Sequence, residues 1–203
     1  MNRPPIAGSI SRLPPPDGYA YLLPAGWLHL DVRPEHRAES VRRAVRRRVS
    51  EEPALGPRRS ELQGLLEREG ALAWLQGAQR VSLLAERDGE SVATAAVTLV
   101  VTEVEGFDLQ EAARDGGRIV ALAQQPAVRL CWSSSAPAPG AGGAAASRCW
   151  QLLVPWPGRP RVALLTMASP CVPLWPLLEA TFDACAQTFH WTWSSSGAPE
   201  PSD

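Results

Sequence analysis

Two patterns that build a hydrophobic core lie at opposite ends of this chain. Near the start, a turn at residues 24–26 leads into 27–32, where apolar and polar side chains alternate as in a half-buried β-strand. Near the end, the apolar residues of 174–189 recur at the spacing of an amphipathic helix, and Trp191 follows them. No recognisable reaction centre lies between these patterns. The sequence therefore indicates a fold more firmly than it indicates a function.

The sequence between these ends predicts an α+β fold, in the order strand, two helices, two strands, helix, four strands, helix. Hairpin signals such as Asp88-Gly89 and the Pro-Gly-Arg-Pro turn at 157–160 join neighbouring strands. Strands joined in this way pair antiparallel, so we expect a largely antiparallel sheet flanked by helices. The expected elements span residues 19–32 (broken near 24–26), 35–50, 60–76, 80–86, 91–103, 107–114, 118–123, 127–132, 148–154, 161–168 and 174–189.

Details of these elements lead to further expectations. Residues 91–103 are mostly apolar on both faces, which is typical of a central strand covered on both sides. Ser60 is a suitable N-cap for the second helix, with Gln63 three residues later as in a capping box. The low-complexity segment 133–147 (SSSAPAPGAGGAAAS) predicts a loop.

The domain is expected to span residues 19–193. Residues 1–18 are rich in proline and predict a disordered lead-in, and 194–203 predict a polar tail. The lead-in lacks the apolar run of a secretory signal, and no stretch approaches 18 consecutive apolar residues. We therefore expect a cytoplasmic protein with no membrane span.

The charge balance limits the classes of partner. The chain has 20 basic and 21 acidic residues, a net charge of −1, so it has no general attraction for nucleic acid or anionic lipid. All basic residues are arginine, which together with the frequent Ala, Gly and Pro indicates GC-rich codon usage. We expect no nucleic-acid partner.

Three short motifs resemble the PsbP-like superfamily, in particular its actinobacterial and LpqN-type members. They are Leu-Pro-Ala-Gly-Trp at 23–27, Leu-Val-Pro-Trp-Pro-Gly at 153–158, and Phe-Asp-Ala at 182–184 followed by Trp191. The resemblance covers roughly residues 20–193. It implies an α/β/α sandwich that acts as a binding or assembly factor, with no family chemistry attached.

Residues for catalysis or metal binding are scarce. The histidines are His29, His36 and His190, and the cysteines, Cys131, Cys149, Cys171 and Cys185, form no CxxC motif. Cys149 and Cys185 are expected to be buried structural thiols. His29 shares a strand face with Asp31, which could orient its imidazole, but no G-x-S-x-G nucleophile motif occurs. We expect no enzyme, cofactor or metal; a hydrolase that uses His29 and Asp31 is one alternative.

The candidate partner-binding residues are arginines and tryptophans. An arginine run on the first predicted helix indicates an acidic protein partner, although Glu39 and Glu51 can neutralise part of its charge. Of eight tryptophans, Trp74, Trp150 and Trp191 have core periodicity, whereas Trp132, Trp156, Trp175 and Trp193 lie at strand ends, at turns or beside proline. Exposed Trp and Arg are typical of binding hot spots. The candidate residues are Arg42, Arg43, Arg46, Arg47, Trp132, Trp156 and Trp175.

These observations favour a non-enzymatic accessory, assembly or adaptor factor that binds another protein. The analogy with the superfamily extends this role to specialised secretion systems. A small-ligand-binding domain with a Trp- and Leu-lined pocket between sheet and helices is the other alternative. The sequence does not determine the oligomeric state.

Overall fold

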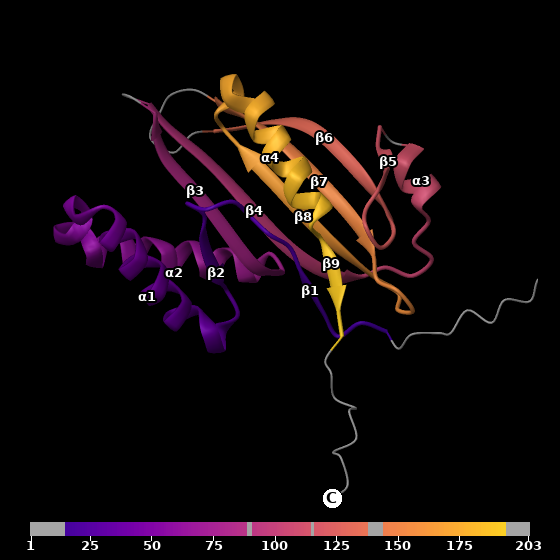
Figure 1. Ribbon diagram of the computed structural model, residues 1–203, viewed down its shortest axis with the longest axis horizontal. Helices are drawn as coiled ribbons and strands as arrows, with labels where there is room; N and C mark the ends of the chain where they lie inside the picture. The colour runs from indigo at the N-terminus through magenta and orange to yellow at the C-terminus, as the bar shows by residue number, and fades with distance from the viewer. Residues whose placement is uncertain (1–14, 89–90, 115, 138–143, 194–203) are drawn as a thin grey trace, which may run out of the picture.

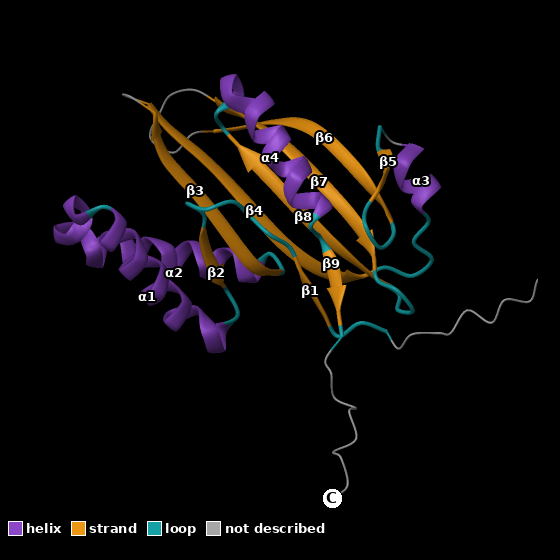
Figure 2. Ribbon diagram, in the orientation of Figure 1, coloured by secondary structure: helices purple, strands orange, loops and turns teal. Residues whose placement is uncertain are grey.

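A seven-stranded antiparallel sheet organises the protein, in the strand order β2-β3-β4-β8-β7-β6-β5. The computed structural model describes residues 15–88, 91–114, 116–137 and 144–193. Helices lie against the sheet (Figures 1 and 2), which confirms the α+β sandwich. The strands of this sheet are β2 (Leu28–Asp31), β3 (Ala78–Asp88), β4 (Ser91–Glu103), β5 (Arg118–Ala121), β6 (Pro126–Pro137), β7 (Ala144–Pro155) and β8 (Arg161–Ser169).

Helix α4 (Trp175–Gln187) covers one face of the sheet, called here the α4 face. Figure 1 shows α4 lying across the sheet, with strands β1 (Gly18–Ala20) and β9 (His190–Thr192) beside its end. Leu178, Phe182 and Cys185 of α4 are buried against the sheet, as the helical spacing predicts. Beneath them lie the buried side chains of Ala95, Val97, Leu99, Trp150, Leu152, Val154, Ala163, Leu165 and Met167.

The opposite face is covered at its two sides by separate helices. A helical lobe, made of α1 (Pro34–Glu51), the 3-10 helix η1 (Pro53–Arg58) and α2 (Arg59–Leu75), packs on β2 and β3. Val41, Val45 and Leu66 of this lobe form a second core with Leu30 and Val81. At the other side, α3 (Leu109–Arg114) contacts β5 and β6.

The close packing of Gly117 against β6 shows which face of the sheet is covered by the chain after α3. A Cβ atom on Gly117 would lie 2.9 Å from both Val128 Cγ1 and Leu130 Cδ2. Val128 pairs with Leu153, and Leu153 with Leu164, so these side chains share the face that carries the helical lobe.

The strands and the ends of the chain join where the hairpin signals predict. β3 pairs with β4 up to Asp88 and Ser91, and β7 pairs with β8 across the turn at 157–160. The predicted low-complexity loop is wrong over most of its length, because Ser133–Pro137 pair with Ala144–Arg148 as a continuation of β6 and β7. Small Ser and Ala residues can extend where a neighbouring strand supplies hydrogen bonds. Residues 138–143 of that segment lie outside the described residues.

The start of the second helix also differs from the sequence expectation. The 3-10 helix η1 leads directly into α2, which begins at Arg59 with Arg58 at the N-cap position and no side-chain cap. Ser60 therefore lies inside the first turn, and Gln63 donates a hydrogen bond to Glu67 Oε1 at 3.0 Å.

Part of the predicted lead-in packs on the domain. The Trp156 indole donates a hydrogen bond to the carbonyl of Pro16 (3.1 Å), and the Asp17 amide donates one to the carbonyl of Thr192 (3.1 Å). β1 pairs with β9, a pairing that the sequence did not indicate. Residues 1–14 and 194–203, expected to be disordered lead-in and tail, lie outside the described residues.

Candidate protein-binding surface

The middle of the sheet is open on the face opposite α4. In the middle of β4, β8 and β7, side chains on the α4 face such as Val97, Leu165 and Leu152 are fully buried, whereas the alternate side chains on the opposite face are only half-buried; farther along β8, Val162 on that opposite face is buried. This open region lies between the helical lobe and α3. We call it the open sheet face, and it consists of Ala96, Thr98, Val100, Leu130, Cys149, Gln151, Leu153, Leu164, Thr166 and Ala168.

The strand register arranges most of these side chains in three rows that run across the strands. The first row is small (Ala96, Ala168, Cys149), the second is polar but uncharged (Thr98, Thr166, Gln151), and the third is aliphatic (Val100, Leu164, Leu153). Gln151 Nε2 donates a hydrogen bond to Thr166 Oγ1 at 2.7 Å, so part of the polarity of the second row is satisfied within the row.

None of the ten side chains of the open sheet face is charged. An antiparallel sheet with one face in water normally alternates apolar residues inside with polar residues outside. Large exposed apolar patches mark interaction sites in soluble proteins, and the side chains of this face are half-buried rather than fully exposed. The sequence already indicated this apolar surface, because residues 91–103 are mostly apolar on both faces. We interpreted that pattern as a strand covered on both sides. The strand is interior as predicted, but on its second face, among the described residues, the helical lobe reaches Val100, and Ala96 and Thr98 stay half-buried.

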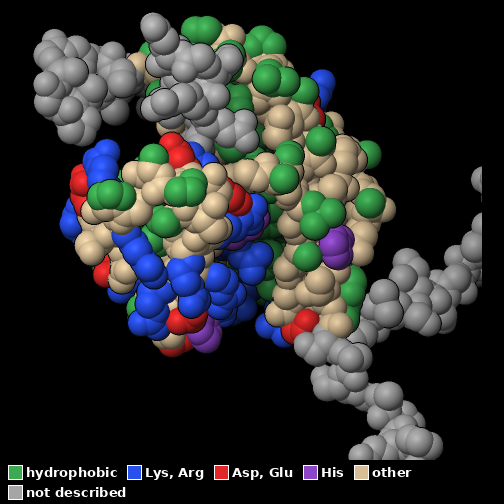
Figure 3. All heavy atoms as spheres, turned by 60° about the vertical axis from the view of Figure 1, so that its left-hand side comes forward, with side chains coloured by type: hydrophobic (Ala, Val, Ile, Leu, Met, Phe, Trp, Pro, Cys, Tyr) green, Lys and Arg blue, Asp and Glu red, His purple; other side chains and the backbone are tan. Residues whose placement is uncertain are grey.

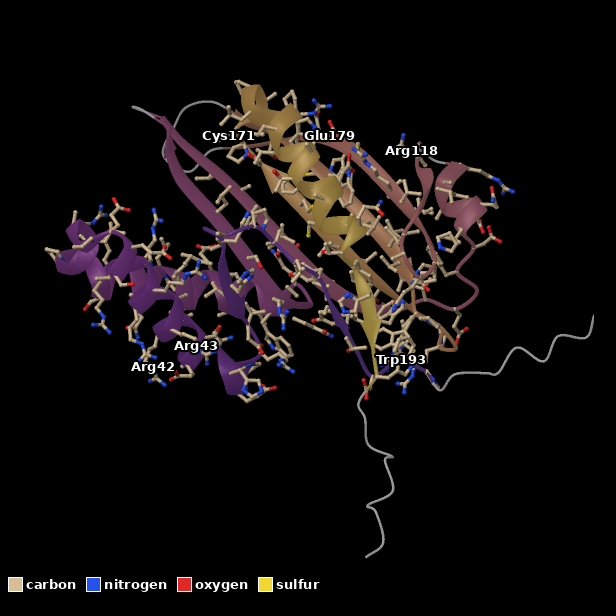
Figure 4. The ribbon with its side chains drawn as sticks, in the orientation of Figure 1. Arg42, Arg43, Arg118, Cys171, Glu179 and Trp193 are labelled. Atoms are coloured by element: carbon tan, nitrogen blue, oxygen red, sulfur yellow. The ribbon has the colours of Figure 1, made fainter. Side chains whose placement is uncertain are left out.

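The predicted arginine surface lies on α1. Arg42, Arg43, Arg46 and Arg47 are all exposed. Figure 3 shows basic side chains gathered on the helical lobe and in the hollow beside it, and Figure 4 shows Arg42 and Arg43 projecting from the lobe. Arg42 and Arg46 share Glu39, and Arg47 pairs with Glu51. Arg43 forms no ion pair within 4 Å in the described ranges, although its positive charge contributes to lowering the pKa of Glu39.

The division of the tryptophans into buried and exposed side chains differs from the prediction. Trp132 is 42% exposed and pairs across the strands with Cys149, beside the open sheet face. Trp156 and Trp175 are buried, at 8% and 2% exposed, so the prediction that they are partly exposed is wrong. The physical reason is aromatic packing: the Trp156 ring packs at a tilt against Trp191 (4.5 Å between ring centroids), and Trp175 packs edge-on against Phe182 (5.8 Å).

Among the other tryptophans, the predicted burial is right at some positions and wrong at one. Trp150 and Trp191 are buried as predicted, and Trp193 is partly exposed as predicted. Trp74 is 37% exposed rather than in the core, because α2 fully buries only Leu66 and Gly70.

A leucine groove lies within the helical lobe where it meets the sheet. Its volume is about 300 Å³, and the ion pairs Arg48–Glu52 and Arg58–Glu61 border it. Its apolar lining is Leu28, Leu55, Leu62, Leu65, Leu66 and Leu83. This is a pocket between sheet and helices, lined by leucines but by no tryptophan.

The proposed pairing of His29 with Asp31 does not form. His29 Nδ1 lies 2.9 Å from Ser82 Oγ, and Ser82 is fully buried, where no substrate could reach its hydroxyl. Asp31 instead accepts hydrogen bonds from the Arg33 guanidinium (2.9 Å from Nε), which lowers the pKa of this carboxyl. The two residues therefore do not make the orienting contact that a hydrolase would need.

The setting of His29 predicts a measurable acid sensitivity. Burial lowers the pKa of His29, and the positive charges of Arg80 and Arg47 lower it further. The unfolded chain, with a His pKa of about 6.5, then binds this proton more readily than the folded protein. The resulting stability is complete above about pH 6.5 and is lost as the pH falls through the lower folded pKa.

Proton NMR of the imidazole should therefore show a titration midpoint below 6.5. The His29→Gln variant should lose less stability than the wild type between pH 7 and 5, as measured by urea unfolding. A midpoint at or above 6.5 would contradict the expected burial effect.

The thiols and carboxylates form no metal centre in the part of the chain that the structure describes. Cys185 is buried, which raises its pKa to about 12, and Cys149 is half-buried. Among the described helices, none is long and apolar enough to cross a membrane.

No protein-family model matches this chain, and no curated protein matches it. Among solved structures, it is similar to a protein from Bacteroides thetaiotaomicron VPI-5482 (1.50 Å crystal structure), with 8% sequence identity and a TM-score of 0.32. The match covers 59% of this chain and 47% of that chain, so it spans about half of that protein's length. A likeness at this level assigns neither a family nor a function to this chain.

Proposed function

We propose that this protein is a non-enzymatic, cytoplasmic adaptor or assembly factor that binds another protein through the open sheet face. The observation that carries the proposal is the half-buried, uncharged surface in the middle of β4, β8 and β7. Covering such a surface with a partner removes apolar area from water, which is the main driving force of protein association. The PsbP-like resemblance supports the same role, and a link to specialised secretion belongs to this proposal.

The arginine surface of α1 lies beyond α2 from this site, because α1 packs on the edge strand β2 and α2 packs on β3, so it would act on a partner at long range. Exposed charges act mainly on the rate and selectivity of association rather than on the final affinity. Arg43, which forms no ion pair within the described ranges, and the partly neutralised Arg42, Arg46 and Arg47 would attract an acidic partner surface. This assigns separate roles to the two surfaces: the open sheet face holds the partner and α1 steers it.

Placing a charge on the open sheet face should strongly weaken binding. The protein would be used as bait in its native host, and the retained partner purified and titrated by calorimetry. Thr166→Arg should weaken this binding by about 100-fold or more, because an unpaired charge would be buried against the partner. The matched control Ala180→Arg adds the same charge on the exposed side of α4 and should bind as the wild type does.

The arginine surface is tested by surface plasmon resonance with the same purified partner. Changing Arg42, Arg43, Arg46 and Arg47 to Glu should slow association and reverse its salt dependence, so that added salt speeds association, with an affinity loss of about tenfold. Equal affinity of wild type and Thr166→Arg would exclude the open sheet face. The adaptor function itself fails if the bait retains no stoichiometric partner.

The leucine groove favours a second candidate function, the binding of a small apolar ligand. Its volume of about 300 Å³ lies at the lower end of the range of ligand pockets. Decanoate, used as a probe at 100 times its dissociation constant, should stabilise the protein by about 2.7 kcal/mol. That corresponds to a rise in Tm of about 5–10 °C by differential scanning fluorimetry. Leu65→Glu, which places a charge on the groove wall, should remove the shift; an equal shift in both proteins would contradict a site in the groove.

A further inference from the structure

We propose that the corner of the sheet beneath β1 binds a small phosphate monoester. A polar cavity of about 380 Å³ lies there, where β1 passes beside the ends of β3 and β4 (Figure 1). We call it the β1 cavity, and its lining includes Tyr19, Asp31, Arg33, Gln79, Arg80 and Arg161. It lies on the α4 face, because Val101 of its lining pairs with Ala163 of that face. The open sheet face is on the other side of the sheet, so this site goes beyond the proposed function.

Arg80 is the cation of the β1 cavity that lacks a carboxylate partner. The register places Arg80 directly opposite Asp31 of β2, on the same face of the sheet. The Asp31 carboxylate binds Arg33 instead, at 2.9 Å from Arg33 Nε to Oδ1. Arg80 forms no ion pair in the described ranges, and its guanidinium lies 5.9 Å from the centroid of the Tyr19 ring. A half-buried cation is normally paired, so this one is available to an anionic ligand.

The positive charge of Arg80 also acts on neighbouring side chains. It lowers the pKa of His29, together with burial and the charge of Arg47. It also opposes the effect of burial at Tyr19 and Tyr21, where burial raises the pKa of both hydroxyls. The potential at this corner of the sheet is therefore positive, which favours an anion.

Two further arginines supply hydrogen-bond donors to the β1 cavity. Arg33 binds Asp31 through Nε and Nη2, and Arg161 binds Glu103 through Nη2 at 2.8 Å. A guanidinium has five N–H donors, so Nη1 of both side chains remains available in the described structure. With Arg80, three guanidinium groups line one cavity. Planar guanidinium groups suit a phosphate monoester, which offers three acceptor oxygens and up to two negative charges.

The rest of the lining favours an organic group that carries hydroxyls. Asp17, Asp31 and Gln79 also line the β1 cavity, and their side-chain oxygens accept hydrogen bonds. Gln79 Oε1 already accepts one from the Tyr19 hydroxyl at 3.3 Å. The carboxylates would repel a bare anion, so the phosphate would lie toward the arginines and the hydroxyls toward Asp17 and Gln79. The volume of the cavity lies within the usual range of small-molecule pockets, about 300–1,000 Å³.

Calorimetric titration of the full chain tests this site, with ribose 5-phosphate, inorganic phosphate and ribose as probes. The wild type should bind the ester with a Kd below about 1 mM, phosphate at least tenfold more weakly, and ribose not measurably. Arg80→Gln should weaken binding of the ester at least tenfold. The matched control Arg118→Gln removes an exposed arginine from β5, at the opposite edge of the sheet, and should bind as the wild type does. Thermal melting without ligand confirms that each variant is folded.

The His29 imidazole provides a readout beside the cavity. A phosphate group bound at Arg80 would offset the positive charge that lowers the pKa of His29. The titration midpoint of His29, followed by proton NMR, should therefore rise when ribose 5-phosphate saturates the wild type. At the same ester concentration, Arg80→Gln should show a smaller change. A midpoint that stays constant at saturation would place the ligand elsewhere and overturn the proposal.

The calorimetric outcomes that overturn the proposal are equally specific. Equal affinity of the ester for the wild type and Arg80→Gln would exclude a site at Arg80. Inorganic phosphate that binds as tightly as the ester would exclude an organic phosphate as the ligand. No binding of either probe at about 10 mM would exclude the anion site altogether. None of these measurements involves a partner protein, so the adaptor function stands or fails separately.

Discussion

Replacing Phe182 with alanine is expected to lower the free energy of unfolding by about 3–5 kcal/mol. Phe182 is fully buried at the centre of the α4 face. Its ring makes edge contacts with Trp27 (6.3 Å between centroids) and Trp175 (5.8 Å). Alanine would remove these contacts and leave a cavity that rigid neighbouring rings cannot fill. The Tm should fall by about 10 °C or more.

The control for this prediction lies on the same helix. Leu177 is 69% exposed, so Leu177→Ala should change the stability by no more than about 0.5 kcal/mol. Phe182→Leu, which refills most of the volume, should recover part of the loss. Urea unfolding followed by tryptophan fluorescence measures all three variants. A loss below about 1 kcal/mol for Phe182→Ala would mean that α4 does not hold this core together.

The second large effect is expected at Arg129, which ties the sheet to α4. This side chain is only 11% exposed and lies over the Trp150 ring, 5.2 Å from its centroid. Its guanidinium donates hydrogen bonds to Asp183 (2.9 Å from Nη1 to Oδ1) and to Glu179. Arg129→Ala would leave two carboxylates of α4 without their cation. We expect a loss of about 2–3 kcal/mol, reduced from the fully buried case because both carboxylates are partly hydrated.

Two comparisons separate the ion pairs from simple packing. Arg129→Lys keeps the charge but lacks the planar fork that bonds both carboxylates, so about half of the loss should persist. A double-mutant cycle with Asp183→Asn should give a coupling energy of about 1 kcal/mol. Arg42→Ala, which removes an exposed pair with Glu39, should change the stability by less than about 0.5 kcal/mol. Equal effects at Arg42 and Arg129 would show that burial does not strengthen the pair.

Local periodicity predicted much of the fold. The apolar spacing of 174–189 predicted α4 and its buried side, and Val41, Ala44 and Val45 are the buried residues of α1 as their spacing indicates. The hairpin signals predicted the antiparallel pairing of β3 with β4 and of β7 with β8. These features are accessible because a helix or a hairpin is formed by residues that are close in the sequence.

The candidate site was only partly predictable. The arginine surface follows from the sequence, since exposed residues on one helix need no distant partner. The burial of Trp156 and Trp175 depends on Trp191 and Phe182, and the contact of His29 with Ser82 depends on the pairing of β2 with β3. Local sequence patterns do not predict these contacts, because each contact joins residues that are far apart in the sequence and become neighbours only in the folded protein.

The sequence by itself determined the helices, the hairpins and the apolar character of both faces of β4. Only the tertiary structure decided which of those faces is covered. Helix α4 packs on one, and the helical lobe and α3 occupy only the two sides of the other. An apolar pattern indicates that burying the surface is favourable. It does not indicate whether the residues that bury it belong to the same chain or to another one. The helical lobe and the chain after α3 reach only the edges of the open sheet face, at Val100 and Leu130, and no described helix of this chain packs on its middle.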